Sequence, residues 1–298
     1  MASSGGLRRE LTIGAAIVLP VAFAIWILVP HDHTNEIAVE EIVDRFRAST
    51  VPNTSPPPSP SPSTSGRVVP VSVAPVTSSV PTTTQPAATA GVVEEVSLVE
   101  PGVYVYRTSG SESVDAFSGV THEYPAETTI TVTAEGCGVL LRWDALEERH
   151  EEWRLCTTEA GIELQPRSLQ YHEFFDQETP EHVVCDRPTL VVPVTDESTG
   201  PNALTCTIED RPWLPRWEVL ESDVREIDGV TVDVRHVRMT IDDDDEHFEH
   251  YVADWLLAPN GLPVELSVSK QSKSPTVVGD VTYHETVQLA LVSTEPLR

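Results

Sequence analysis

The densest group of residues able to bind a metal is the run IDDDDEHFEH, residues 241–250. Carboxylate oxygens are ligands for calcium and imidazole nitrogens for transition metals, so Asp243, Asp245, His247 and Glu249 are the candidate ligands. Calcium loops space their ligands with glycine, which this run lacks. In a strand, His247 and Glu249 share one face while the second histidine points away from it. We therefore expect a solvated acidic turn at a hairpin tip, with no bound metal or cofactor.

The chain carries no local catalytic motif. It has no G-x-S-x-G elbow, no H-E-x-x-H, no P-loop and no glycine-rich dinucleotide turn. The acidic pairs Glu147–Glu148 and Glu151–Glu152 fall beside a predicted surface turn, which favours exposed charge over an acid–base dyad. Five further histidines are scattered along the chain: His122, His172, His182, His236 and His284. We expect no enzymatic activity, and an envelope hydrolase is the third of three hypotheses, because convergent sites need no local motif.

Two tryptophans are candidates for a binding surface. Trp213 and Trp217 lie in RPWLPRWEVL, a segment bounded by prolines. Exposed aromatic side chains commonly mark binding surfaces, so these two are candidates for one if the segment is exposed, and core residues otherwise. Trp143, Trp153 and Trp255 fall in predicted strands, where they are expected to anchor the core.

Four cysteines, Cys137, Cys156, Cys185 and Cys206, all lie in the distal part of the chain. Zinc sites commonly use close C-x2-C pairs, which are absent, so an even number of cysteines favours two disulfides. Residues 138–156 read as a hairpin in which Cys137 falls opposite Cys156. By elimination Cys185 pairs with Cys206.

The register of that hairpin is predicted from side-chain pairs. Placing Trp143 opposite His150 sets Arg142 opposite Glu151 and Leu140 opposite Trp153, which gives one ion pair and one apolar pair. Directly opposed strand residues are about 4.5–5.5 Å apart at Cα, a separation that suits a disulfide.

Residues 92–298 are long enough for one domain and read as β almost throughout. The predicted strands alternate apolar and polar residues or are rich in β-branched residues, and they cover 102–108, 128–133, 139–143, 151–156, 168–174, 189–194, 203–208, 217–220, 230–241, 247–257, 264–270 and 280–292. Only the segments near Leu146 and at 217–224 leave room for a helical turn. We expect a mostly β fold built on an antiparallel sheet, either an unclosed half-barrel or a β-sandwich.

The C-terminal meander resembles a known family. The run Asp254–Pro263, DWLLAPNGLP, is a strand, a tight turn and the start of the next strand, and a last strand, VTYHETVQLALV, follows it. These elements resemble the tail of the lipoprotein-carrier superfamily that includes LolA, RseB and LppX. The resemblance implies a curved antiparallel half-barrel that shelters acyl chains on its concave face. The chain as a whole resembles a membrane-anchored actinobacterial envelope protein.

Residues 11–29, LTIGAAIVLPVAFAIWILV, are uncharged and long enough to cross a bilayer as a helix. Arg8 and Arg9 precede the span and acidic residues follow it, so residues 1–10 form a cytoplasmic tail and the rest lies outside. The alternative is a cleaved signal peptide, since Ala22-Phe23-Ala24 resembles a cleavage site. We expect an uncleaved single-pass anchor in the cell membrane, with the lipid bilayer as its partner.

Two segments separate the span from the domain. Residues 31–49 contain a predicted short juxtamembrane helix, with Asn35 as its N-cap and an apolar stripe from Val39 to Phe46. This stripe either has no partner, lies along the membrane interface or pairs with a second copy. Residues 50–91 are rich in proline, serine and threonine, which predicts a disordered linker acting as a stalk.

Net charge limits the partners. The chain has a formal net charge of −28, nearly all of it in residues 92–298, which argues against binding of DNA or RNA. The first functional hypothesis is a membrane-anchored extracytoplasmic domain that binds an apolar or lipid-like envelope ligand. The second is an extracytoplasmic protein-interaction or sensor module whose partner is an envelope protein.

Overall fold

A computed structural model of the chain describes residues 35–50, 97–116, 119–195, 199–209, 211–243, 248–276 and 279–298. Within these ranges the chain is mostly β, with seventeen strands in one large antiparallel sheet that does not close. The described part also contains one helix, α2 (Val39–Thr50). The predicted antiparallel β class is therefore confirmed.

The first half of the sheet is a series of hairpins whose strands are β1 (Gly102–Val114), β2 (Val120–Glu123), β3 (Glu127–Glu135), β4 (Gly138–Leu146), β5 (Arg149–Thr158), β6 (Gly161–Leu164), β7 (Arg167–Phe174), β8 (Gln177–Cys185) and β9 (Thr189–Pro193). The second half consists of β10 (Thr199–Ala203), β11 (Cys206–Ile208), β12 (Arg211–Trp213), β13 (Arg216–Ile227), β14 (Val230–Asp243), β15 (Glu249–Leu257), β16 (Pro263–Thr276) and β17 (Gly279–Leu291).

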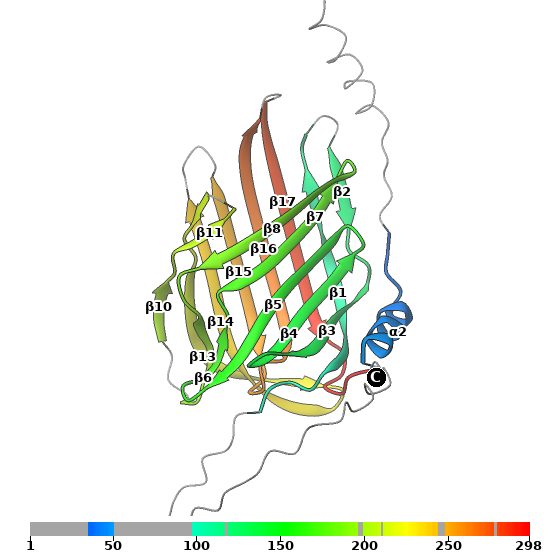
Figure 1. Cartoon of the computed structure of the whole chain (residues 1–298), viewed down its shortest axis with the longest axis vertical. Coiled ribbons are helices and arrows are strands. Elements are labelled where there is room, and N and C mark those ends of the chain that lie inside the picture. Colours follow the sequence, from blue (N-terminus) through cyan, green and yellow to red (C-terminus); the bar gives the residue numbers. More distant parts are fainter. Residues whose placement is uncertain are drawn as a thin grey trace, which may run out of the picture. The chain divides into compact units, whose positions relative to one another are not determined.

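Strand β1 joins the two halves, because it pairs with β3 along one edge and with β17 along the other. From β3 the sheet continues through β4, β5, β7, β8, β11 and β12, and from β17 it continues through β16, β15, β14, β13 and β10. Strands β4, β5, β7 and β8 cross obliquely in front of β14–β17, so the sheet folds back over itself as two layers (Figure 1).

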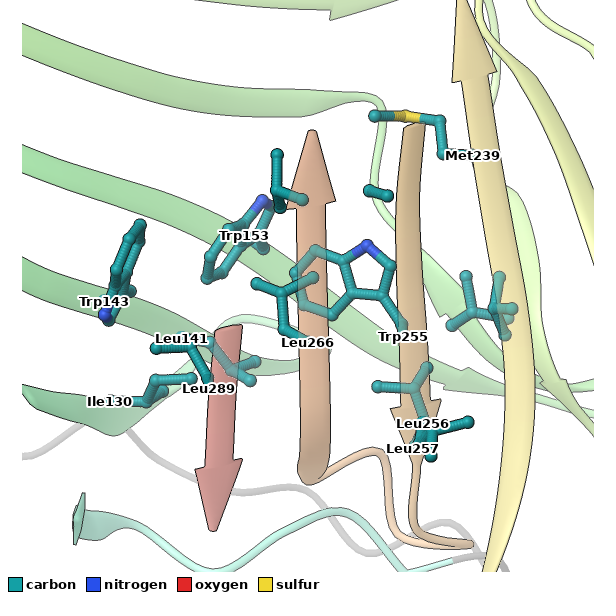
Figure 2. Close-up of a cluster of buried hydrophobic side chains, with 14 of the residues drawn as sticks. Ile130, Leu141, Trp143, Trp153, Met239, Trp255, Leu256, Leu257, Leu266 and Leu289 are labelled. Atoms are coloured by element: carbon teal, nitrogen blue, oxygen red, sulfur yellow. The ribbon is translucent and has the colours of Figure 1, made fainter. Parts of the chain in front are cut away.

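The core fills the space between these layers. Every second residue of β14–β17 points inward, as the alternation of the sequence predicts, for example Val237, Ala253, Leu266 and Leu289. Figure 2 shows Trp153 of the front layer facing Trp255 of the back layer. Their rings meet edge to face, with centroids 4.8 Å apart and planes at 87°. This aromatic contact is a direct link between the two halves of the sheet.

The structure adds strands that the sequence did not reveal. The strands β2, β6, β8 and β12 were not predicted. The predicted strand 203–208 is interrupted between β10 and β11, where the Leu204 amide donates to the Pro215 carbonyl at 3.0 Å. The segments near Leu146 and at 217–224, where a helical turn was allowed, belong to β4 and β13.

The predicted register of the β4–β5 hairpin is wrong by one residue. The structure pairs Trp143 with Glu151 and Leu141 with Trp153. The reason is a register shift between Asp144 and Leu146, which carries the ladder into the stretch that had been read as a loop. Alternation alone cannot reveal a bulge next to a turn.

Both predicted disulfides are present, Cys137–Cys156 and Cys185–Cys206. Cys185 and Cys206 are directly opposed on β8 and β11. Cys137 lies in the β3–β4 turn, and Cys156 pairs in the ladder with Gly138 instead.

Helix α2 packs on the β domain. Ile42, Val43 and Phe46 are buried against Val103 of β1, in an apolar cluster separate from the main core. Two nitrogens of Arg47 donate to the carbonyl of the C-terminal residue at 2.9 and 2.7 Å. The apolar stripe of this helix is therefore covered by the chain's own domain, which was not among the expected partners.

Asn35 does not cap this helix. Its backbone amide and side-chain amide donate to the Glu148 carboxylate at 3.2 and 3.0 Å, and its carbonyl accepts from the Glu147 amide at 3.1 Å. The first helical amides instead donate to the Ala38 carbonyl. Asn35 thus fastens the segment before α2 to the β4–β5 turn.

The docking of α2 bears on the predicted stalk, which itself stays a prediction. Helix α2 precedes residues 51–96 in the chain and packs on β1, which follows them, so both ends of that segment belong to one folded unit. The segment cannot set the distance between the span and the domain while α2 is docked. The predicted span 11–29 and most of the linker 50–91 lie outside the described residues. None of the helices described is long and apolar enough to cross a membrane.

Replacing Phe46 with alanine should release α2. Removing a buried phenylalanine costs about 3 kcal/mol, and the cluster around Phe46 is small. Hydrogen–deuterium exchange measured by mass spectrometry should show α2 amides exchanging about 100-fold faster, while β16 and β17 are unchanged. Glu40→Ala, on the exposed face of the same helix, is the control and should leave the exchange as it is. Slow exchange of α2 in Phe46→Ala would show that another contact holds the helix.

Candidate binding site in the interior of the sheet

The two tryptophans that are candidates for a binding surface are buried. Trp213, at the end of β12, is 9% exposed and Trp217, near the start of β13, is 8% exposed. Between them, Leu214 and Pro215 turn the chain from one end of the unclosed sheet to the other. Both indoles are buried, and both line the same interior pocket.

Two adjoining cavities lie beside these tryptophans. The first has a volume of about 30 Å³ and the second of about 40 Å³. Four residues line both of them: Trp153, Leu164, Trp217 and Trp255. The two small cavities therefore adjoin each other between the two layers, and indole rings lie at their junction.

The two cavities differ in polarity. The first is lined only by apolar residues, among them Val191 and Val237. The second also meets polar groups, including Gln165, Ser168 and Gln170. One end of the interior space is thus apolar and the other is polar.

The β10–β12 segment forms part of the wall of the second cavity through Leu204 and Trp213. The disulfide Cys185–Cys206 fastens it to β8, and Arg187 donates to the Ala203 carbonyl at 2.6 Å. This wall is therefore held by one covalent link and by hydrogen bonds at the surface.

A buried ionic network occupies the rest of the interior. The carboxylate of Glu112, on β1, has no exposed surface. It lies 3.0 Å from Nδ1 of His122 and 2.9 Å from Nδ1 of His172, and it accepts a hydrogen bond from the Tyr283 hydroxyl at 3.0 Å. Two of the histidines that are scattered in the sequence thus meet on one carboxylate.

Arg149 connects this cluster to both layers. Its guanidinium is fully buried, donates to Glu285 of β17 at 3.0 Å and to Glu151 of its own strand, and lies 3.6 Å from Glu112. The Tyr124 hydroxyl also donates to Glu285, at 2.7 Å. Glu148 and Glu151, predicted to be exposed, are buried, and they contact Asn35 and Arg149 respectively.

Lys270 carries the network to the second cavity. Its ammonium lies 3.4 Å from the Gln170 side chain and 3.8 Å from Glu249, and it sits over the rings of Tyr251 and Tyr283. Glu249 in turn accepts from the Trp213 indole at 3.4 Å. Two residues from different predicted sites, Trp213 and Glu249, are thus brought into contact.

The network sets the protonation of its members. Burial opposes ionisation of Glu112, but the hydrogen bonds from His122 and His172 outweigh it and lower the pKa of Glu112 to about 2. Burial likewise opposes ionisation of Glu285, and the charge of Arg149 reverses this and lowers its pKa. Both carboxylates are therefore ionised at neutral pH inside the protein.

The acidic turn does not assemble a metal site from the residues that the structure describes. No group of three or more histidine, cysteine, aspartate or glutamate residues in those ranges could hold a metal ion. Glu249 faces the interior, whereas His250 is exposed and lies 2.7 Å from Asp242. Asp243 ends β14, and Asp245 and His247 lie outside the described residues.

A polar groove of about 1040 Å³ lies on the sheet, bordered by β1 and by β13–β17. Its charges are largely paired with one another. Asp254 accepts from His236 and Arg238 at 2.6 and 2.8 Å, and Arg225 donates to Glu265 at 2.9 Å. This groove could receive a polar partner only by breaking those pairs.

No protein-family model, curated protein or solved structure matches this chain. The functional argument therefore rests on the residues and on the geometry that the fold gives them.

The stability contributed by Glu112 should disappear in acid. Its pKa in the folded protein lies below the ordinary value of about 4.5, so its contribution is complete above that value and falls as the pH drops toward 2. A shift of this size corresponds to about 3 kcal/mol. In urea unfolding, the stability difference between the natural protein and Glu112→Gln should shrink by about that amount between pH 5 and pH 2.

The neighbouring exposed Glu123 provides the matched control. Glu123→Gln should change the acid dependence by only a few tenths of a kcal/mol. A constant difference between the natural protein and Glu112→Gln across this pH range would contradict the assigned protonation.

Proposed function

We propose that the β domain binds an apolar, lipid-like ligand in the tryptophan-lined interior between its two layers. The observation that carries this proposal is the pair of adjoining cavities at Trp153, Trp217 and Trp255, at the place where the sheet does not close. Ligand sites are commonly apolar concavities with a few convergent polar groups, and the interior has both. The resemblance of the meander to lipoprotein carriers supports the same ligand class.

Binding requires the interior to widen. The cavities hold about one to three water molecules, far less than an acyl chain. The β10–β13 region is the place where widening costs least, because only short ladders and the backbone bond between Leu204 and Pro215 join the two sides of the sheet there. The β10–β12 segment would move outward there while Cys185–Cys206 keeps it attached to β8.

The location follows from the N-terminal sequence and the cysteines. Two disulfides are typical of an oxidising, extracytoplasmic compartment. The apolar run 11–29 would anchor the chain in the cell membrane with its domain outside. With α2 docked, five residues separate the end of that run from Asn35, so the domain would lie close to the bilayer.

A second candidate function is a protein-interaction or sensor module. The groove beside β13–β17 favours it, since its arginine and acidic side chains would suit a polar protein partner. The pairing of those charges with one another makes it the weaker candidate.

The mass of the mature protein tests whether residues 11–29 remain as an uncleaved membrane anchor. Protein extracted from membranes of its native host should have the mass of all 298 residues, because an uncleaved anchor keeps its N-terminus. Carbonate washing should leave it in the membrane, as expected of a span rather than of a peripheral contact. A mass lacking residues 1–24 would replace the anchor with a cleaved signal peptide.

Ligand binding can be followed by quenching of tryptophan fluorescence. The full chain in amphipol, carrying Trp26→Phe to silence the predicted span, should be quenched by dibromooctadecane, because bromine quenches indoles within contact range. Val191→Phe fills the first cavity and should weaken quenching at least tenfold. Val184→Phe, at a position 42% exposed on a neighbouring strand, is the matched control and should bind normally.

A variant that enlarges the cavities gives a second test, which does not depend on inserting a larger side chain into the core. Leu164→Ala, which widens both cavities, should bind the probe more tightly than the natural protein. Equal quenching of the natural protein, Val191→Phe and Leu164→Ala would mean that the probe binds elsewhere, and the proposed function would fail.

A further inference from the structure

The indole nitrogen of Trp255 is buried and has no hydrogen-bond partner among the described residues. Tryptophan N–H groups are donors only, and buried ones almost always find an acceptor. Leaving such a donor unpaired costs about 1–3 kcal/mol. An unsatisfied donor in the core therefore needs an explanation from its surroundings.

This N–H lies at the candidate site. Trp255 lines both cavities, so its ring stands at their junction. In Figure 2 its nitrogen lies on the ring edge turned toward Met239, which lines the second cavity. The unpaired donor thus faces the more polar of the two spaces.

The neighbouring polar groups do not satisfy it. Trp213 donates its own indole N–H to Glu249, and Gln170 is engaged by Lys270. An acceptor for Trp255 must therefore come from a molecule that enters the cavity. A water molecule in the second cavity is small enough to supply that acceptor, because Gln165 and Ser168 line the same space. A ligand that displaces such a water must bring an acceptor of its own, or the Trp255 donor is left unpaired.

We propose that the ligand of this interior is a long-chain acyl ester whose carbonyl oxygen accepts the Trp255 N–H. The hydrocarbon chain occupies the first cavity and its extension, and the alcohol part of the ester points toward Gln165, Ser168 and Gln170. This assignment rests on the proposed function and adds the position and chemistry of its one polar contact.

A neutral ester fits better than a free carboxylate. The ionic network beside the cavity already pairs Lys270 with Glu249 and Arg149 with Glu285. A further buried negative charge would lie near Glu249 without a cation of its own, which is costly. An ester carbonyl accepts a hydrogen bond and brings no charge.

Two probes of matched chain length test the assignment. Dibromooctadecane and methyl dibromostearate differ in the ester group, and both quench indole fluorescence. In the full chain carrying Trp26→Phe, the ester should bind about tenfold more tightly than the alkane, the gain expected from one buried hydrogen bond. In Trp255→Phe the ester and the alkane should bind with about the same affinity. The affinity for the alkane itself should change by less than a few-fold.

Trp217→Phe is the matched control, because Trp217 lines the same two cavities and its nitrogen is not an orphaned donor. It should keep the tenfold preference. If Trp255→Phe does not fold, Trp255→benzothienylalanine removes only the N–H and keeps the ring shape, and it should lose the preference in the same way.

The outcomes separate this inference from the proposed function. Equal affinity of the natural protein for ester and alkane, with both quenching, would overturn the carbonyl contact and leave the apolar site standing. A tenfold preference that survives in both Trp255 variants would also overturn it. Absence of quenching by either probe would overturn the site itself, and the inference with it.

Discussion

The structure depends on one buried cation. Arg149 is surrounded by carboxylates from three strands, its own β5 and the two joining strands β1 and β17. A guanidinium removed from water is tolerated only when its donors are paired, and removing one partner leaves an uncompensated charge worth several kcal/mol. The network therefore fixes how the front layer lies over the back layer. Because Trp153 shares a face of β5 with Arg149, the same constraint places it against Trp255.

The inward-facing residues of several strands change from charged to apolar at about the same height in the sheet. On β5, Arg149 and Glu151 are followed on the same face by Trp153 and Leu155, and on β15, Glu249 is followed by Tyr251, Ala253 and Trp255. Strand β16 shows the change in the opposite chain direction, from the apolar Leu266 to Lys270, and β17 shows it again in the original direction, from Glu285 to Leu289. Antiparallel neighbours must reverse the order for the two zones to align. The result is a charged zone and an apolar zone that meet at the second cavity, an arrangement suited to a ligand with one polar group on a long chain.

The apolar–polar alternation that predicts the strands also places charged residues of the ionic network on the buried faces of those strands. Glu112 stands an even number of residues from Tyr104 and Tyr106, and Glu285 from Val287 and Leu289, so each carboxylate shares a face with core residues. Extending the apolar face to the end of each strand would have predicted that Glu112 and Glu285 are buried. The sequence could not show that these charged groups meet, because the partners of Arg149 are brought together by the pairing of β1 with β17. Glu285, for example, is 136 residues away from Arg149 in the chain. The bulge at Ala145 and the inward turn of Trp213 and Trp217 likewise depend on tertiary packing, which local patterns do not encode.

Helix α2 changes what an anchor at residues 11–29 would do. A twelve-residue helix is marginal in isolation, so its stability comes from Val103 and from the contacts of Asn35 and Arg47. Those contacts fall on the domain that follows the proline-rich segment, so the residues on either side of that segment belong to one folded unit. The tether that remains between the apolar run and Asn35 is five residues, which places Val29 about 20 Å from Asn35 at full extension. A domain held this close to a bilayer could exchange an acyl ester with the membrane without carrying it through water, whereas a domain on a long stalk could not. If residues 11–29 anchor the chain, the docked helix and the proposed ligand are linked, because a short tether would bring the apolar interior within reach of apolar ligand in the bilayer.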